Sequence, residues 1–222
     1  MAGTHTSTRL REDFKVNGEW MIFTLVTHSP YVYEHIHSIS GMRWVNVGRR
    51  CLEGGHEQKK HPNYIGCKNN FTDFQQFVEW SRLEVGYQEF EENGNAWCLD
   101  KDILGNDSKT YSPETCLFVP NRVNIFLTAR GALRGNAPLG VCWNTRTKKY
   151  QAQMTLSGRK VYLGSFDDPM EGHRAWQLAK INTARDIANE YKGWHDRLNI
   201  GLNVWADKIQ SDYENYRETI KL

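Results

Sequence analysis

The chain contains 222 residues, enough for one full domain or for two to three small modules. Hydrophobic residues make up 39% of it and aromatic residues 12%, which excludes an intrinsically disordered chain. No run approaches the roughly 18 apolar residues that a membrane span requires, and residues 1–13 are polar and of mixed charge. We therefore expect neither a membrane protein nor a secreted precursor, and we expect a cytoplasmic location.

The cysteines are odd in number and widely spaced along the chain, which argues against a disulfide framework and fits a reducing compartment. They are Cys51, Cys67, Cys98, Cys116 and Cys142. The first four could in principle form a structural Zn²⁺ site, but the paired knuckles that are usual in such sites are absent. Scattered buried thiols are the favoured interpretation, and structural zinc is not expected.

The net charge of +2 conceals a strongly basic segment. Residues 115–166 include no acidic side chain, so their positive charges are uncompensated within the segment. These basic residues are Arg122, Arg130, Arg134, Arg146, Lys148, Lys149, Arg159 and Lys160. Such a one-sided patch is typical of a surface that binds a polyanion, although an ordinary solvated surface is the alternative.

Four elements are expected in the first part of the chain. The apolar run at 19–27 predicts a strand, and the spacing of apolar residues at 35–50 is compatible with a helix. The glycines at 54 and 55 end that helix and open a polar loop that runs to Pro62. Aromatic residues on a 3.6-residue period predict a second helix at 72–83, with its aromatic face in the core.

The next segment predicts the order strand, loop, strand, helix. Residues 96–104 and 115–119 are short apolar runs, and the loop between them carries turn residues. Pro120 closes the second strand, and residues 121–129 are expected to form the helix.

Three short strands and a long helix are expected to follow. The strands are at 141–143, 149–155 and 160–166, joined by tight turns. Asp168 can cap the following helix, Pro169 suits its first position, and Gly193 is its expected stop. The tail at 198–222 is expected to be a further helix that docks on one of the modules.

The first strand of the strand–loop–strand–helix segment ends in a group of polar residues. Asp100, Lys101 and Asp102 place two carboxylates and an amine ahead of a turn, and Asn124 on the following helix can return an amide oxygen to the same point. Carboxylate and amide oxygens suit Mg²⁺ or Mn²⁺. A divalent ion with a nearby base or water-positioning group is what phosphodiester hydrolysis requires, although Asp and Asn are also common in ordinary turns.

Specific sequence blocks resemble the HNH endonuclease motif of phage and group I intron homing enzymes. The blocks are WCLDKDIL at 97–104 and YSPETCLFVP at 111–120, then Asn124, with WVNV at 44–47, Arg50-Cys51 and HPNYIGC at 61–67 upstream. The resemblance implies a ββα-metal nuclease core at 41–129. It also implies that Asp100 and Asn124 bind Mg²⁺ (or Mn²⁺).

The family pattern has a histidine general base where this chain has Lys101. Three interpretations follow. Lys101 is a base with a depressed pKa, or it stabilises phosphate charge while His61 or Asp102 positions water, or the enzyme is inactive.

A second set of blocks resembles the Apetala-two type DNA-binding domain of plant ethylene-response factors. They are GVCW at 140–143, KYQAQM at 149–154 and YLGSFD at 162–167. The resemblance implies a three-stranded antiparallel sheet, packed on a helix, that lies in the DNA major groove. If Tyr150, Ala152 and Met154 face the helix, then alternation turns these residues toward DNA: Asn144, Lys149, Gln151, Gln153, Lys160 and Tyr162. Arg146, Lys148 and Arg159 are then expected near phosphates.

We therefore expect an α+β protein with an N-terminal segment of unassigned role at 1–40, a nuclease domain at 41–129, a DNA-binding domain at 138–192 and a C-terminal helix at 198–222. The expected function is that of a phage or homing-type, metal-dependent endonuclease of double-stranded DNA in a bacterial host cell. The alternative is a catalytically inactive, sequence-specific DNA-binding protein on a decayed HNH core. A third possibility, an RNA-directed protein, is separated from these by competition between duplex DNA and RNA.

Overall fold

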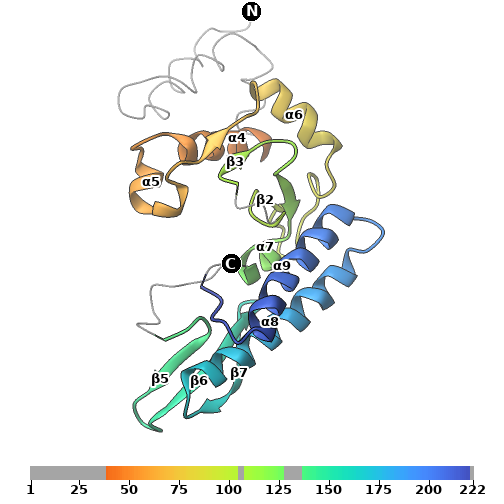
Figure 1. Cartoon of the computed structure of the whole chain (residues 1–222). Coiled ribbons are helices and arrows are strands. Elements are labelled where there is room, and N and C mark those ends of the chain that lie inside the picture. The colour runs from red at the N-terminus through yellow and green to blue at the C-terminus, as the bar shows by residue number, and fades with distance from the viewer. Residues whose placement is uncertain (1–38, 105–107, 128–136, 221–222) are drawn as a thin grey trace, which may run out of the picture.

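The structure, a computed structural model, describes residues 39–104, 108–127 and 137–220. It is a mixed α+β protein, as the sequence predicts, and it includes a three-stranded antiparallel sheet (Figure 1). The helices are α4 (Ile39–Cys51), α5 (His56–Lys60), the 3-10 helix η1 (Pro62–Tyr64), α6 (Phe74–Leu83), α7 (Asn121–Leu127), α8 (Pro169–Glu190) and α9 (Asp196–Glu214). The strands are β1 (Lys68–Asn69), β2 (Cys98–Asp100), β3 (Thr110–Tyr111), β4 (Leu117–Val119), β5 (Val141–Asn144), β6 (Lys149–Leu156) and β7 (Arg159–Phe166).

Several expectations fall outside the described residues. They are the strand at 19–27, the start of the helix at 35–50, the end of the helix at 121–129 and the positions of Arg130 and Arg134. Among the helices within 39–104, 108–127 and 137–220, none is long and apolar enough to cross a membrane.

The amino-terminal part of the described chain is built on an aromatic cluster between α4 and α6. Trp44 of α4 packs against Phe74 and Phe77 of α6, with ring centroids 6.0 and 5.5 Å apart. Asp73 caps α6 by accepting a hydrogen bond from the Gln76 amide at 2.8 Å. The expected aromatic face of this helix is therefore confirmed as core.

The prediction of a polar loop between Gly54 and Pro62 is wrong, because the chain forms α5 and η1 there. Gln58 explains the difference. Its side chain is buried and donates to the carbonyl groups of Arg50 and Tyr64, while its oxygen accepts from the Gly54 amide. A glutamine that satisfies three backbone groups holds this segment in a compact form that its polar composition does not indicate.

The strand–strand–helix order expected from the sequence is present in β2, β4 and α7. Strands β2 and β4 pair antiparallel, with Asp100 opposite Leu117, and α7 begins two residues after β4 ends. The strands are shorter than expected because the chain turns directly after Asp100. A second pairing was not expected, since β1 and β3 have two residues each and join in parallel, with Asn69 opposite Tyr111.

The carboxyl-terminal sheet follows the order β5, β6, β7 with α8 across one face. Asp168 accepts from the Met170 amide at 2.7 Å and Pro169 occupies the first turn, so α8 begins where the sequence predicts. Met154 packs with Trp176 of α8 in the small core beneath the sheet. Leu163 is an extra residue in β7, where the pairing register shifts between Ala152 and Gln153.

The strand–strand–helix unit and the α8–α9 hairpin share one hydrophobic core. Apolar side chains of β4 and α7 lie in the same cluster as the buried faces of α8 and α9. This cluster includes Leu117, Phe118, Val119, Val123, Phe126, Ile181, Ala184, Ile187, Leu198, Leu202, Trp205 and Ile209. The segments expected at 41–129, 138–192 and 198–222 are therefore packed together, and α9 is the docked tail helix.

Polar bonds fix the hairpin on this unit. His195, which precedes α9, bonds through Nε2 to the carbonyl oxygen of Phe118 at 2.9 Å and stacks on Trp97. Arg197 donates to Glu84 and to the carbonyl groups of Pro113 and Glu114 at 2.8 to 3.0 Å. A Cβ atom on Gly201 of α9 would lie 2.9 Å from the Ile103 oxygen, so α9 touches the turn that follows β2.

Lys180 of α8 is buried at the carboxyl end of α7. Its amine donates to the Phe126 carbonyl and lies 3.9 Å from the centre of the Phe126 ring, with Trp176 and Trp205 also around it. Burial lowers the pKa of Lys180 to about 7. The bond supplies a hydrogen-bond donor to one of the carbonyl groups at the carboxyl end of α7 that have no partner within the helix.

We expect the stability of the protein to depend on pH through Lys180. Between its folded pKa of about 7 and its ordinary value of 10.5, the unfolded chain binds a proton that the folded chain does not. The free energy of unfolding attributable to Lys180 therefore rises with pH, by up to about 1.4 kcal/mol per pH unit. Urea titrations at pH 7.0 and 8.5 should show this rise in wild type relative to Lys180→Met. Comparison of these two chains cancels the contribution of the thiols to the pH dependence. Lys192→Met, which replaces an exposed lysine, is the control and should keep the wild-type pH dependence. An equal pH dependence in wild type and Lys180→Met would contradict the assignment.

Candidate functional site

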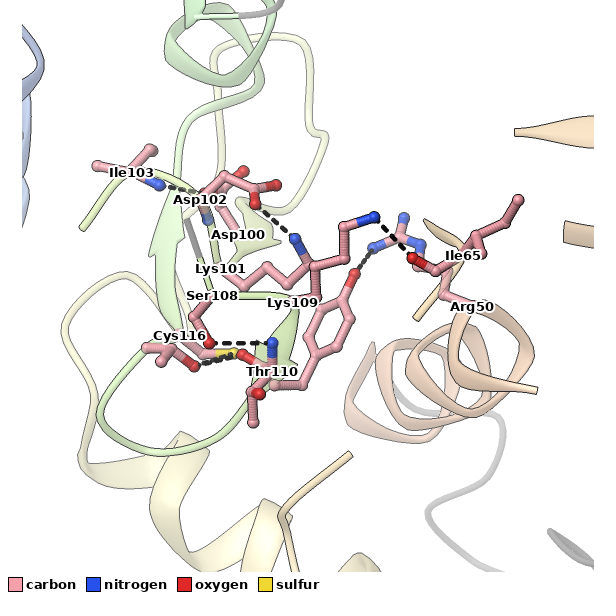
Figure 2. Close-up of polar contacts among 12 residues, drawn as sticks. Arg50, Ile65, Asp100, Lys101, Asp102, Ile103, Ser108, Lys109, Thr110 and Cys116 are labelled. Atoms are coloured by element: carbon pink, nitrogen blue, oxygen red, sulfur yellow. Dashed lines mark hydrogen bonds and ion pairs between the residues drawn. The ribbon is translucent and has the colours of Figure 1, made fainter. Parts of the chain in front are cut away.

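The turn after β2 is organised by the carboxylate of Asp100. Its Oδ1 atom accepts hydrogen bonds from the Asp102 amide at 2.7 Å and the Ile103 amide at 2.9 Å (Figure 2). Burial raises the pKa of Asp100 and the neighbouring charge of Asp102 raises it further, although the two amide donors oppose this. The turn therefore concentrates negative charge that a cation would stabilise.

Lys101 is buried and its amine points back to the same turn. The amine bonds to Asp102 Oδ1 at 2.5 Å and lies 5.7 Å from the centre of the Tyr111 ring (Figure 2). Burial on its own lowers the pKa of Lys101, but the hydrogen bond and charge of Asp102, together with Cys67 and Asp100, outweigh burial and leave the pKa raised. Lys101 is therefore a cation at neutral pH in this structure, which favours charge stabilisation over action as a base.

Asn124 lies on α7 beside the face of β2 that carries Asp100. Residues 98 and 100 are two apart on a strand, so their side chains share a face. The Cys98 thiol donates to the Asn121 side-chain oxygen at 3.7 Å. Burial and the charge of Asp100 raise the pKa of this thiol, while a hydrogen bond with Asn124 lowers it. The Asn124 side chain therefore lies near Cys98, on the strand that also carries Asp100.

A second group of side chains lies around Tyr111 of β3, which precedes β4, the strand that pairs with β2. Arg50 at the end of α4 donates to the Tyr111 hydroxyl at 3.3 Å and lies 5.1 Å from the centre of the Tyr64 ring. Lys109 donates to the Ile65 carbonyl at 2.6 Å (Figure 2). The sequence blocks include Arg50 and Tyr111, but nothing in their spacing indicates that a residue of α4 meets a tyrosine 61 positions later.

His61 stands between α5 and η1 with its side chain exposed. Its ring makes an edge contact with Tyr64, with centroids 5.9 Å apart. Tyr64 in turn lies under Arg50, so His61 is linked to the site through two intervening side chains and the described contacts do not join it to Asp100 or Lys101.

The expected nucleic-acid face is the side of the β5–β6–β7 sheet opposite to α8. Ala152 and Met154 are buried on the helix side, and the strand register then places the alternate residues on the other side. The residues on this outer face are Asn144, Lys149, Gln151, Gln153, Lys160 and Tyr162. Arg146, Lys148 and Arg159 are exposed in the two turns or at their edges. The alternation expected from the sequence is therefore present.

Some polar atoms of the outer face already have partners. The Asn144 oxygen accepts from the amides of Arg146 and Thr147, at 3.0 and 3.1 Å, and so shapes the β5–β6 turn. Lys149 pairs with Asp167 at 3.1 Å at the surface, where such a pair contributes little to stability. Tyr162 is 62% exposed, which leaves its ring available for contact.

Metal ligation by this site depends on oxygen donors. Within the described ranges, no group of three or more His, Cys, Asp or Glu side chains is arranged to hold a metal ion. A site of Asp100 with the Asn124 amide has fewer protein ligands than that and suits an ion that keeps several waters, as Mg²⁺ does.

Comparisons with family models, with characterised proteins and with solved structures find no match to this chain.

We expect Asp100→Asn to fold almost as stably as wild type, because the amide oxygen can keep both turn hydrogen bonds. Asp100→Ala loses them and should reduce the free energy of unfolding by about 1 to 3 kcal/mol. Chemical denaturation of both variants tests this. As a control, Asp167→Ala removes only an exposed pair and should cost less than about 1 kcal/mol. Equal losses for Asp100→Asn and Asp100→Ala would show that the carboxylate does not organise the turn through these bonds.

Proposed function

We propose that the chain is a metal-dependent endonuclease of double-stranded DNA, with a nuclease site at the β2–β4–α7 unit and a site-selecting surface on the β5–β6–β7 sheet. The observation that carries the proposal is the turn after β2, where the carboxylate of Asp100 and the buried amine of Lys101 lie side by side, with Asn124 on α7 near Cys98 of the same strand. The resemblance to homing-type HNH enzymes supports the same assignment, and a phage enzyme acting in a bacterial host is the setting that it implies.

Asp100 and Asn124 would hold the divalent ion, Mg²⁺ or Mn²⁺. When bound there, such an ion polarises the phosphate and lowers the pKa of water. The protein contributes a turn that is fixed in advance, because Asp100 is held by two backbone amides and Asn124 projects from a helix that is anchored in the core. A preformed arrangement reduces the reorganisation that the reaction requires.

Lys101 would stabilise negative charge on the phosphate. Its contact with Asp102 keeps it protonated and holds its amine at the turn. Asp102 is then an acidic group that can orient water, because its side chain is exposed and lies in the same turn. His61 is the alternative water-positioning group, although it would have to approach from the other side of Tyr64.

Conversion of supercoiled plasmid tests the nuclease. We expect cleavage by wild type with Mg²⁺ or Mn²⁺ and none with EDTA. Asp100→Asn and Asn124→Ala should slow it by roughly 100-fold or more, since each removes a group that positions charge in the transition state. Lys101→Met should have a similar effect, whereas a larger loss in Asp102→Asn than in His61→Ala would identify Asp102 as the water-positioning residue.

The inactive DNA-binding protein is the second candidate, and the protonated state of Lys101 favours it, because the usual base is missing. Wild type that shifts duplex DNA in a gel but leaves plasmids intact with every metal would establish this candidate and remove the nuclease. Cleavage that survives in Asp100→Asn would remove the assigned site.

The sheet surface makes a separate prediction. Gln151 and Gln153 are half-buried on the outer face, where a glutamine can donate to and accept from an adenine edge. Each substitution by Ala should weaken binding to a selected target duplex by about 1 to 3 kcal/mol and leave binding to random duplex unchanged. Thr155→Ala, at the far end of the same face, is the matched control, and binding is measured by fluorescence anisotropy. Equal losses on target and random duplex would exclude a base-reading role.

A further inference from the structure

A cluster of three basic side chains lies around Tyr111 and Cys67. Its members are Arg50, Lys101 and Lys109. Arg50 contacts the Tyr111 hydroxyl and Lys101 lies over the Tyr111 ring. The thiol of Cys67, which is 5% exposed, feels the charges of Lys101, Lys109 and Arg50 together. The three cations come from different parts of the chain, and the β1–β3 pairing brings those parts together.

The positive charge of this basic cluster is mostly not neutralised by carboxylates. Among the ion pairs of the described residues, Lys101 is the only member that has one, with Asp102. Arg50 is held by a hydroxyl and an aromatic ring and also feels the charge of Glu57 without an ion pair, and Lys109 is held by a backbone carbonyl. Such partners orient the charges and leave them able to attract an anion.

We propose that Arg50 and Lys109, beside Lys101, form a binding site for one backbone phosphate of DNA, next to the phosphate that is cleaved and that Lys101 faces. The inference rests on the proposed function and names the part of the substrate that this cluster takes. Because Lys101 directly follows Asp100, a phosphate at the cluster lies beside the metal ligand. The planar Arg50 fork suits two phosphate oxygens at once, and the lysine amines add point charges.

The dependence of duplex binding on salt measures this contact. Each neutralised phosphate contributes about 0.9 to the slope of log affinity against log salt concentration. We expect Arg50→Gln and Lys109→Gln each to lower the slope by part of that amount, and the double variant to lower it by about the whole amount and to weaken binding about eightfold at 0.1 M salt. Arg50→Lys, which keeps the charge, should retain most of the slope. Lys59→Gln, which removes an exposed lysine from α5, is the matched control and should leave the slope unchanged.

Lys109 is exposed, so its substitution tests the site even if Arg50→Gln weakens folding. Cleavage by wild type is measured in parallel. An unchanged slope in Lys109→Gln, or in folded Arg50→Gln, with an active wild type would overturn the phosphate site and leave the nuclease in place. A reduced slope with an inactive wild type would support the phosphate site and remove the nuclease. Titration with inorganic phosphate at constant ionic strength distinguishes a free-anion site. Phosphate that binds to wild type without any change of DNA slope in the variants would contradict the inference.

Discussion

Most of the apolar side of the β2–β4–α7 unit is buried against α8 and α9. Strands of three residues and a helix of seven cannot form a core of their own. Val123 and Phe126 are almost completely buried in the core shared with the helical hairpin, and Phe118 of the same core also packs against Trp80 and Tyr87. Helix α8 of the hairpin also covers one face of the β5–β6–β7 sheet, so the candidate nuclease unit and the sheet share one scaffold.

The packing of α8 and α9 against the β2–β4–α7 unit also fixes the position of the candidate site. Lys180 bonds to the end of α7, which carries Asn124, and Gly201 lets α9 approach the turn that Asp100 organises. His195 bonds to the carbonyl oxygen of Phe118 in β4, next to the partner of Asp100. Burial lowers the pKa of His195, although the bond to Phe118 opposes this. The neutral ring is therefore favoured in the folded chain, and its contribution to stability is present above the ordinary pKa and is lost as pH falls below it.

Local signals in the sequence predicted much of the fold, and long-range contacts account for what they missed. Asp168 and Pro169 define the start of α8 because capping depends on adjacent residues. Strands β1 and β3 were missed, since two residues carry no periodicity and their pairing depends on the tertiary structure. Apolar stripes indicated that α8 and α9 bury a face, but not that the face meets β4 and α7. In the candidate site, the polar run at the end of a predicted strand and the resemblance to HNH enzymes single out Asp100 and Lys101, whereas the meeting of Arg50 with Tyr111 has no local signal.

In the proposed function, the chemistry takes place at the turn after β2 and target selection on the sheet, and both regions contact phosphates. This function depends on the binding of one divalent ion by Asp100 and Asn124. Equilibrium binding of Mn²⁺, followed by electron paramagnetic resonance of the free ion in the presence of a short duplex, tests this claim directly. We predict one Mn²⁺ per wild-type chain and loss of that ion in Asp100→Asn, which keeps the turn folded. Equal Mn²⁺ binding by wild type and folded Asp100→Asn would contradict it.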